Sequence, residues 1–324
     1  MPKSDIRSRH YSKVDSKIIS DASSGRVRVA SLADQGVLLQ LLKTMRPKQW
    51  TKNLVVFAAI LFTKNLFNMP ILLRVTFGFV IFCLLASSIY IINDVLDIEE
   101  DKYHPKKCNR PLASGSLSKS TAIGAAGWLM IASLGGSFLL GLRFGLVAAA
   151  YFIVFILYSF FLKKIVIVDV SVLSSAYVFR AVAGAVVINV EISPWLILCT
   201  ILLALFLGLS KRRHEMILLE DNATNHRKIL EEYDPKLLDQ MIGVVTSSTV
   251  MAYSLYTFGS ETALKTHNLM LTIPFVIFGI FRYLYLVYHK NMGGSPERIL
   301  LEDKPLIANI VLWIIMVLVV LYTS

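Results

Sequence analysis

The feature that most restricts the fold of this chain is a series of apolar stretches, each of about 17 residues or more, that recurs along most of its length. In helical form, a stretch of this length spans the hydrocarbon core of a lipid bilayer. The nine candidate spans cover residues 37–62, 71–93, 121–141, 144–162, 165–188, 194–210, 240–259, 268–288 and 305–323. With 55% hydrophobic and only 17% charged residues, the chain is too apolar for a soluble domain. The sequence therefore predicts an all-α, polytopic membrane protein.

Positive charges predict the orientation of the spans, because Lys and Arg favour cytoplasmic loops. With the N-terminus inside, the inside connections carry 16 Lys or Arg and the outside connections carry four. Residues 1–34 are polar, Ser-rich and basic, which predicts a disordered cytoplasmic tail before a single transmembrane domain at 35–324. We expect the protein in the cell inner (plasma) membrane. Membrane topology and phosphate-facing surface explain the net charge of +11, so nucleic acid is not needed as a partner.

A row of oxygen-bearing side chains lies at the end of the second apolar stretch, where a helix would emerge from the bilayer. In angular order around the helix axis, from roughly 0° to roughly 100°, these side chains are Asn93, Asp97, Asp101 and Asp94. Glu99 falls at roughly 240°, away from this face. A polar helix end in the headgroup region is the simple alternative. Such polar groups are costly beside lipid, so their gathering on one face favours a function.

Carboxylates in this position are typical ligands of a hard divalent cation. Mg²⁺ takes oxygen ligands, often one or two carboxylates together with substrate phosphates. We therefore expect Asp94, Asp97 and Asp101 to be catalytic and to hold Mg²⁺, with Asn93 beside the substrate. Because polar residues concentrate at the inside ends of the helices, the active site is expected to face the cytoplasm.

Basic residues beside this face suggest an anionic substrate. The loop after Asp101 contains Arg110, whose guanidinium can bind a phosphate through two hydrogen bonds. Near the inside end of the first span, Lys48, Lys52 and Asn53 are further candidates to contact a substrate phosphate. Lys48 and Lys52 are four residues apart and are therefore expected to share a helix face. An ordinary positive-inside loop, and lysines that reach lipid phosphates, are the respective alternatives.

Polar residues of the later spans complete the set of candidates. Asp169 and Arg180 lie in one apolar segment, where both are costly unless they face a polar cavity, although a structural role for Arg180 stays open. Tyr158 and Lys163 close the fourth span, and Lys211 closes the sixth, where stop-transfer charge is the alternative. We expect all five to contribute to substrate binding. The sequence contains no Walker loop, nucleotide-binding glycine fingerprint or His-Glu-x-x-His motif.

The pattern Asn-Asp-x-x-Asp-x-x-x-Asp, here at 93–101, resembles the signature of the UbiA superfamily of intramembrane prenyltransferases. The resemblance extends over nearly all of the chain after residue 35. It implies a bundle of about nine transmembrane helices around a central cavity that opens to the lipid. It also implies Mg²⁺-dependent chemistry on a diphosphate.

Within this superfamily, three segments are similar to the branch that transfers phosphoribose: 46–53, 109–115 and Lys211-Arg-Arg-His-Glu215. Ordinary members carry a second Asp-x-x-x-Asp pair, whereas here Leu173 stands four residues after Asp169. The resemblance implies 5-phosphoribosyl 1-diphosphate as donor and a polyprenyl (decaprenyl) phosphate in the bilayer as acceptor. An aromatic prenyltransferase is the alternative, and a membrane transporter is a remote one. The sequence is compatible with a homo-oligomer.

Overall fold

The computed structural model describes residues 36–103, 107–191, 193–220, 233–260, 268–290, 292–294, 299 and 301–323. Eight helices within these ranges are long and apolar enough to cross a membrane. They confirm the prediction of an all-α membrane fold. The proposed tail at 1–34 lies outside the described residues.

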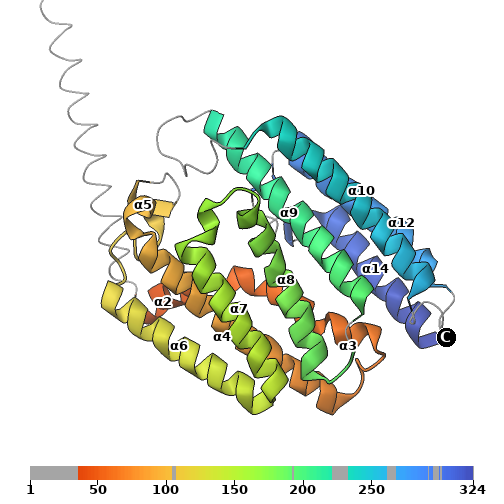
Figure 1. The fold of residues 1–324 in the computed structure, drawn as a ribbon, viewed down its shortest axis with the longest axis horizontal. Helices are drawn as coiled ribbons and strands as arrows, with labels where there is room; N and C mark the ends of the chain where they lie inside the picture. Colours follow the sequence, from red (N-terminus) through yellow and green to blue (C-terminus); the bar gives the residue numbers. More distant parts are fainter. Residues whose placement is uncertain are drawn as a thin grey trace, which may run out of the picture.

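The first predicted span is not a single helix. It consists of α2 (Val37–Met45), the 3-10 helix η1 (Pro47–Phe57) and the short α3 (Ala58–Phe62), and Figure 1 shows α2 and α3 at opposite ends of the bundle. Pro47 lacks a backbone N–H and its ring obstructs the preceding turn, so α2 ends before it. Arg46, which joins the two helices, has a left-handed φ of 54°. The expected nine long helices are therefore eight plus one interrupted segment.

The remaining helices run back and forth along one another (Figure 1). They are α4 (Met69–Leu96), α5 (Ile98–Lys102), η2 (Lys107–Asn109), α6 (Lys119–Leu140), α7 (Leu142–Phe160), η3 (Leu162–Lys164), α8 (Val168–Val187), α9 (Pro194–Glu220), α10 (Pro235–Gly259), η5 (Leu269–Thr272), α12 (Ile273–His289) and α14 (Lys304–Thr323). Helix α4 packs mainly on α6, and α9 packs between α8 and α10. The α5 end of the bundle lies opposite the C-terminus (Figure 1). The connection that carries Arg110 and the η3 corner that carries Lys163 both reach this end, where they pair with aspartates of the α4–α5 stretch.

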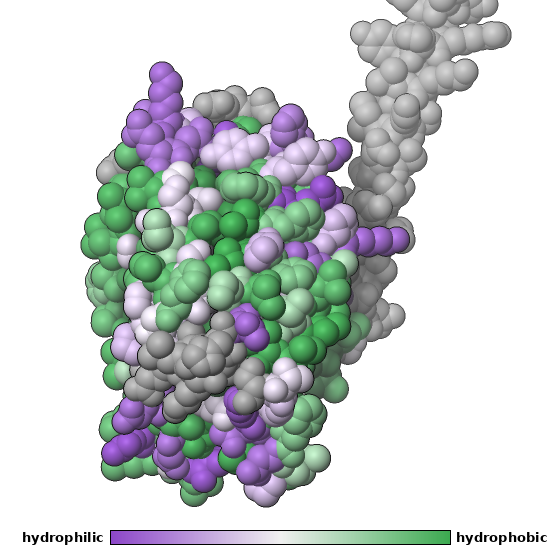
Figure 2. Space-filling view, turned by 90° about the vertical axis from the view of Figure 1, so that its right-hand side faces the viewer, coloured by the Kyte–Doolittle hydropathy of each residue, from purple (hydrophilic) through white to green (hydrophobic). Residues whose placement is uncertain are grey.

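The outer surface of the bundle is apolar, as lipid contact requires. Figure 2 shows a broad apolar band on one face, with hydrophilic residues gathered above and below it. Large side chains such as Leu139 and Trp128 are exposed, with 91% and 69% of their surface accessible. In water such exposure would be unfavourable, whereas in a bilayer these side chains contact lipid tails.

The backbone of η1 packs directly against the backbone of α8. A side chain at Gly184 would collide with the carbonyl oxygen of Val56, so only glycine allows this approach. One turn earlier on α8, Arg180 donates a hydrogen bond from Nε to Oδ1 of Asn53 over 2.5 Å. One face of α8 thus holds η1 through a glycine contact and a buried hydrogen bond.

Candidate active site

Three aspartates at the end of α4 and in α5 are buried on one face. Asp94, Asp97 and Asp101 are 2%, 4% and 2% exposed. Glu99 and Glu100, in the same stretch, are exposed. Helix α4 ends at Leu96, yet the N–H of Asp101 still donates to the carbonyl of Asp97 over 2.8 Å, so the helical turn continues. The observed burial therefore follows the face that the helical angles predict.

Basic side chains from three separate segments pair with these aspartates. Nη1 of Arg110 donates to Oδ1 of Asp94 (3.0 Å) and to Oδ2 of Asp101 (2.5 Å). Arg46 also pairs with Asp94, and Nζ of Lys107 lies 3.8 Å from Oδ1 of Asp101. Because one guanidinium nitrogen joins two buried carboxylates, Arg110 is the central cation of this group.

Asp97 has its own partners. Nζ of Lys163, on η3, donates to Oδ1 of Asp97 over 2.7 Å, and Nδ2 of Asn93 donates to Oδ2 over 2.9 Å. Lys163 lies 66 residues away in sequence. The fold therefore brings Asn93, Arg110 and Lys163, all expected at the site, into contact with the carboxylates.

The donor chemistry of this group suits Mg²⁺. Within the described ranges, no three His, Cys, Asp or Glu side chains are arranged to hold a metal ion as they stand. The reason is visible in the ion pairs, since basic side chains occupy the carboxylate oxygens of Asp94, Asp97 and Asp101. Buried carboxylate oxygens are nevertheless the ligands that Mg²⁺ prefers, and cations that can turn to a phosphate-bearing ligand lie beside them. The residues present fit a metal that arrives with an anionic substrate.

A second polar group surrounds Asp169 at the start of α8. Nε of Arg212 donates to Oδ2 of Asp169 and the hydroxyl of Tyr233 donates to Oδ1, each over 2.7 Å. Asp169 is 0% exposed and Arg212 is 3% exposed. Burial and the hydrogen bond to Asp169 raise the pKa of Tyr233 to about 12, so its hydroxyl remains a donor at neutral pH. Both carboxylate oxygens of Asp169 thus have protein partners, and the group joins α8, α9 and the start of α10.

Tyr233 also stabilises an unfavourable backbone conformation. Ile167, just before α8, has a φ of 68°, which a β-branched residue rarely adopts. The N–H of Ile167 donates to the hydroxyl of Tyr233 over 2.8 Å. One hydroxyl therefore supports both the strained turn and the buried carboxylate.

We expect Tyr233→Phe to lower the free energy of unfolding by about 2 kcal/mol, because it leaves a buried donor and a buried acceptor without that partner. The measurement is the thermal midpoint of the detergent-solubilised protein. Tyr288→Phe is the matched control: its hydroxyl also donates to an aspartate, Asp239, over 2.7 Å, but in an exposed position. Equal midpoints for the two variants would contradict a structural role for the Tyr233 hydroxyl.

Arg180 and Asn53 lie deep in the bundle. Asn53 also donates to Sγ of Cys83 over 3.1 Å, and Nη2 of Arg180 donates to the hydroxyl of Tyr151 over 3.2 Å. Cys83 precedes Asp94 by 11 residues on α4, which corresponds to roughly 16 Å along the helix. The structure joins Arg180 and Asn53 to each other and separates them from the aspartates. Their expected contact with substrate stays a prediction.

The remaining expected residues are Lys48, Lys52, Tyr158 and Lys211. Lys48 is exposed and Lys52 half-buried. The argument that they share a helix face is wrong, because in a 3-10 helix of about 3 residues per turn, positions four apart differ by about 120°. Tyr158 packs at the edge of the apolar core, and Nζ of Lys211 lies 3.8 Å from Glu215. Their roles in substrate binding stay predictions.

The comparisons with known proteins agree with this architecture. The UbiA prenyltransferase family matches residues 54–297. The chain belongs to this family. A decaprenyl-phosphate phosphoribosyltransferase of Corynebacterium glutamicum is 34% identical over 87% of this chain and 86% of its own length. One from Mycolicibacterium smegmatis is 35% identical over 85% of this chain and 90% of its own.

Solved structures show the same fold. A UbiA homolog from Archaeoglobus fulgidus bound to DMAPP and Mg²⁺ has a TM-score of 0.67, with 18% identity, and covers 88% of this chain and 100% of its own. The same homolog bound to GPP and Mg²⁺ has a TM-score of 0.66, with 18% identity, over 87% of this chain and 99% of its own. This UbiA-family chain is therefore a multi-pass membrane transferase.

Several members of the two polar groups in this UbiA-family protein were not among the residues expected from sequence. They are Arg46, Lys107, Arg212 and Tyr233. Arg46 and Arg212 each lie within a basic segment already noted, 46–53 and 211–215, so their charge was visible. Which neighbour in each segment turns inward depends on local backbone geometry, such as the left-handed φ of Arg46.

Proposed function

We propose that this protein transfers 5-phosphoribose from 5-phosphoribosyl 1-diphosphate to a polyprenyl phosphate, decaprenyl phosphate in the first instance, and releases diphosphate. The product is a lipid-linked phosphoribose of the kind used in cell-envelope sugar synthesis. The observation that carries the proposal is the 34–35% identity to curated decaprenyl-phosphate phosphoribosyltransferases over most of both chains.

The site geometry supports this assignment. Arg46, Lys163, and the pair Lys107 and Arg110 come from three separate segments and converge on the buried aspartates at one end of an apolar bundle. Such a site can bind a multiply charged diphosphate at the membrane surface, while a polyprenyl chain stays in the apolar phase. We assign it to the cytoplasmic face of the plasma membrane, with the N-terminus on the same side, because the positive-inside rule favours that orientation.

The transfer breaks one bond and forms one bond, and it needs no strong general base. The C1–O bond between ribose and diphosphate breaks, and diphosphate leaves with the electron pair. An oxygen of the lipid phosphate, already anionic, forms the new bond to C1 from the opposite face. Arg110, which contacts both Asp94 and Asp101, is placed to turn a guanidinium toward the departing diphosphate.

Each group in the site has a proposed role. Asp94, Asp97 and Asp101 would hold Mg²⁺, which as a Lewis acid would offset negative charge on the diphosphate. Lys163 would shift from Asp97 to a phosphate oxygen, and Arg46 would do the same from Asp94. Asp169 would position Arg212 and Tyr233 through its hydrogen bonds. Action as a homo-oligomer stays a prediction.

The test is an assay of the purified protein in proteoliposomes with labelled 5-phosphoribosyl 1-diphosphate, decaprenyl phosphate and Mg²⁺. We expect mass spectrometry to detect decaprenyl-phosphoryl-phosphoribose together with diphosphate. We also expect EDTA to abolish the product and added Mg²⁺ to restore it, because the carboxylates bind substrate through the metal.

A parallel reaction with a labelled prenyl diphosphate and an aromatic acid distinguishes the alternative. Prenylation of the ring, with no lipid-linked phosphoribose in the first reaction, would overturn the assignment. Undiminished transfer in EDTA would contradict only the assignment of Mg²⁺, and the assignment of donor and acceptor would stand.

A further inference from the structure

A pocket of about 610 Å³ lies beside the candidate active site, between the α4–α5 junction and the loop at 110–118. It is separate from the group of aspartates. Its α5 wall is made by Ile98, Glu99 and Lys102, whereas the buried Asp97 and Asp101 belong to the other face of the same stretch. None of the residues given a role in the proposed reaction lines this pocket.

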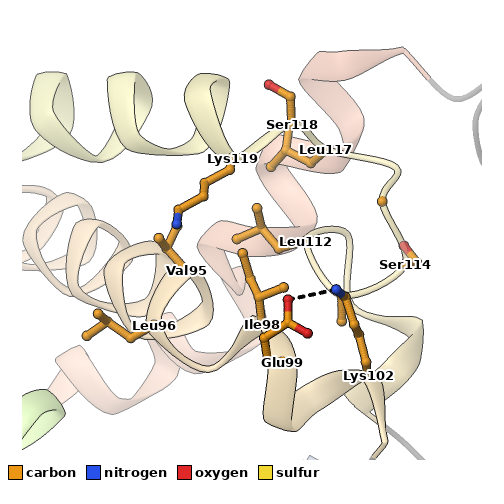
Figure 3. A pocket seen from close by; sticks show the side chains of 12 residues that line it. Val95, Leu96, Ile98, Glu99, Lys102, Leu112, Ser114, Leu117, Ser118 and Lys119 are labelled. Atoms are coloured by element: carbon orange, nitrogen blue, oxygen red, sulfur yellow. Dashed lines mark hydrogen bonds and ion pairs between the residues drawn. The ribbon is translucent and has the colours of Figure 1, made fainter.

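The walls of the pocket are partly apolar and partly basic. Leu96, Leu112 and Leu117 contribute apolar surface. Figure 3 shows Lys119 extending from the start of α6 toward Val95, and Lys102 on the opposite side paired with Glu99 over 2.8 Å. The two lysines exceed the single carboxylate of the lining, which favours an anionic ligand.

The pocket lies at the membrane surface. Lys119 is the first residue of α6 and Leu96 the last of α4, and both helices are apolar enough to span a bilayer. Leu96 is 43% exposed, and Ile123, one turn into the membrane from Lys119, is 53% exposed. Basic side chains thus stand at the headgroup level, with exposed apolar side chains below them. This order matches that of a lipid, from a phosphate to a hydrocarbon chain, and does not match a small soluble anion.

The wall at 110–118 is a compact turn that also carries an active-site residue. The N–H of Ser114 donates to the carbonyl of Arg110 over 2.8 Å, and that of Leu117 to the carbonyl of Pro111 over 3.0 Å. Gly115 adopts a φ of 77° within it. A ligand against Leu112 and Leu117 therefore contacts the same turn that places Arg110 on the aspartates.

We propose that this pocket binds a lipid with an anionic phosphate headgroup, the phosphate between Lys102 and Lys119 and the hydrocarbon chain against Leu96 and Ile123. The proposal is independent of the transfer reaction. Two lipids supply this chemistry: an acidic phospholipid of the bilayer and a polyprenyl phosphate.

The test measures lipid binding to the purified full-length protein by native mass spectrometry, with phosphatidylglycerol, phosphatidylcholine and polyprenyl phosphate titrated separately. We expect phosphatidylglycerol to bind more tightly than phosphatidylcholine. In the double variant Lys102→Gln, Lys119→Gln, we expect the affinity for anionic lipids to fall about 30-fold. Each lysine near a lipid phosphate raises the affinity about fivefold, and the two effects multiply.

Lys236→Gln is the matched control. Lys236 is also an exposed lysine in the first turn of a capped helix, α10, but it does not line the pocket. It should leave lipid binding unchanged. A loss confined to phosphatidylglycerol identifies a bilayer lipid as the ligand, and a loss confined to polyprenyl phosphate identifies the acceptor. Equal binding of both anionic lipids by the double variant and the unaltered protein would overturn the proposal. So would an unaltered protein that binds neither phosphatidylglycerol nor polyprenyl phosphate more tightly than phosphatidylcholine.

Discussion

Asp97→Asn is expected to reduce phosphoribosyl transfer by at least about 10²-fold, with the chain still folded. The substitution keeps the size of the side chain but removes the charge that would hold Mg²⁺. It also leaves Nζ of Lys163, now 2.7 Å from Oδ1, without an ionised partner. The measurement is the initial rate of lipid-linked phosphoribose formation in proteoliposomes, beside the thermal midpoint of each preparation. Asp94→Asn should behave in the same way.

Glu100→Gln is the control for these variants. It removes a carboxylate from the same stretch of chain, but Glu100 is exposed whereas Asp97 is 4% exposed. We expect its transfer rate to stay within about twofold of that of the unaltered protein, since isolated surface charges contribute little. A rate for Asp97→Asn equal to that of Glu100→Gln, at matched thermal midpoints, would remove Asp97 from the catalytic group.

Gly184→Ala is expected to lower the free energy of unfolding by about 3 kcal/mol, the upper range for an overpacked core. The new methyl group would collide with the carbonyl oxygen of Val56, and backbone cannot move aside as a flexible side chain can. Separation of η1 from α8 would also stretch the hydrogen bond between Arg180 and Asn53. The measurement is the thermal midpoint in detergent.

Gly127→Ala is a control for which we expect the opposite change in stability. Gly127 lies within α6, and a methyl group there would meet nothing within 4 Å. Since alanine is a better helix former than glycine, this variant should be stabilised by about 0.5–1 kcal/mol. A Gly184→Ala protein as stable as Gly127→Ala would show that η1 and α8 can separate without cost.

Local pattern predicted the membrane helices well, because lipid requires long apolar segments with internally satisfied backbone groups. Its main error was the first span, which is apolar overall but in which Pro47 ends the α-helix. The 3-10 geometry of η1 then invalidated the shared face of Lys48 and Lys52. Hydropathy reports whether a segment can cross a membrane, and it does not report how the backbone is wound within it.

Within the site, the prediction was accurate where one helical stretch was enough. The angular order of Asp94, Asp97 and Asp101 foretold their common burial, and Glu99 lies outside as expected. Contacts between segments distant in sequence could not be predicted in this way. Arg46 lies 48 residues from its partner Asp94, and no periodicity relates two residues that far apart.

The amino-acid sequence was sufficient to predict the class of fold, the carboxylate face and the resemblance to the UbiA superfamily. These features depend on side chains that are close together in the chain. The tertiary structure decided which basic residues reach the carboxylates and which expected residues lie elsewhere. It placed Lys163 on Asp97, Arg212 and Tyr233 on Asp169, and Arg180 deep in the bundle against Asn53. The physical reason is that a buried charge must find a partner, and packing of all the helices determines which partner is within reach.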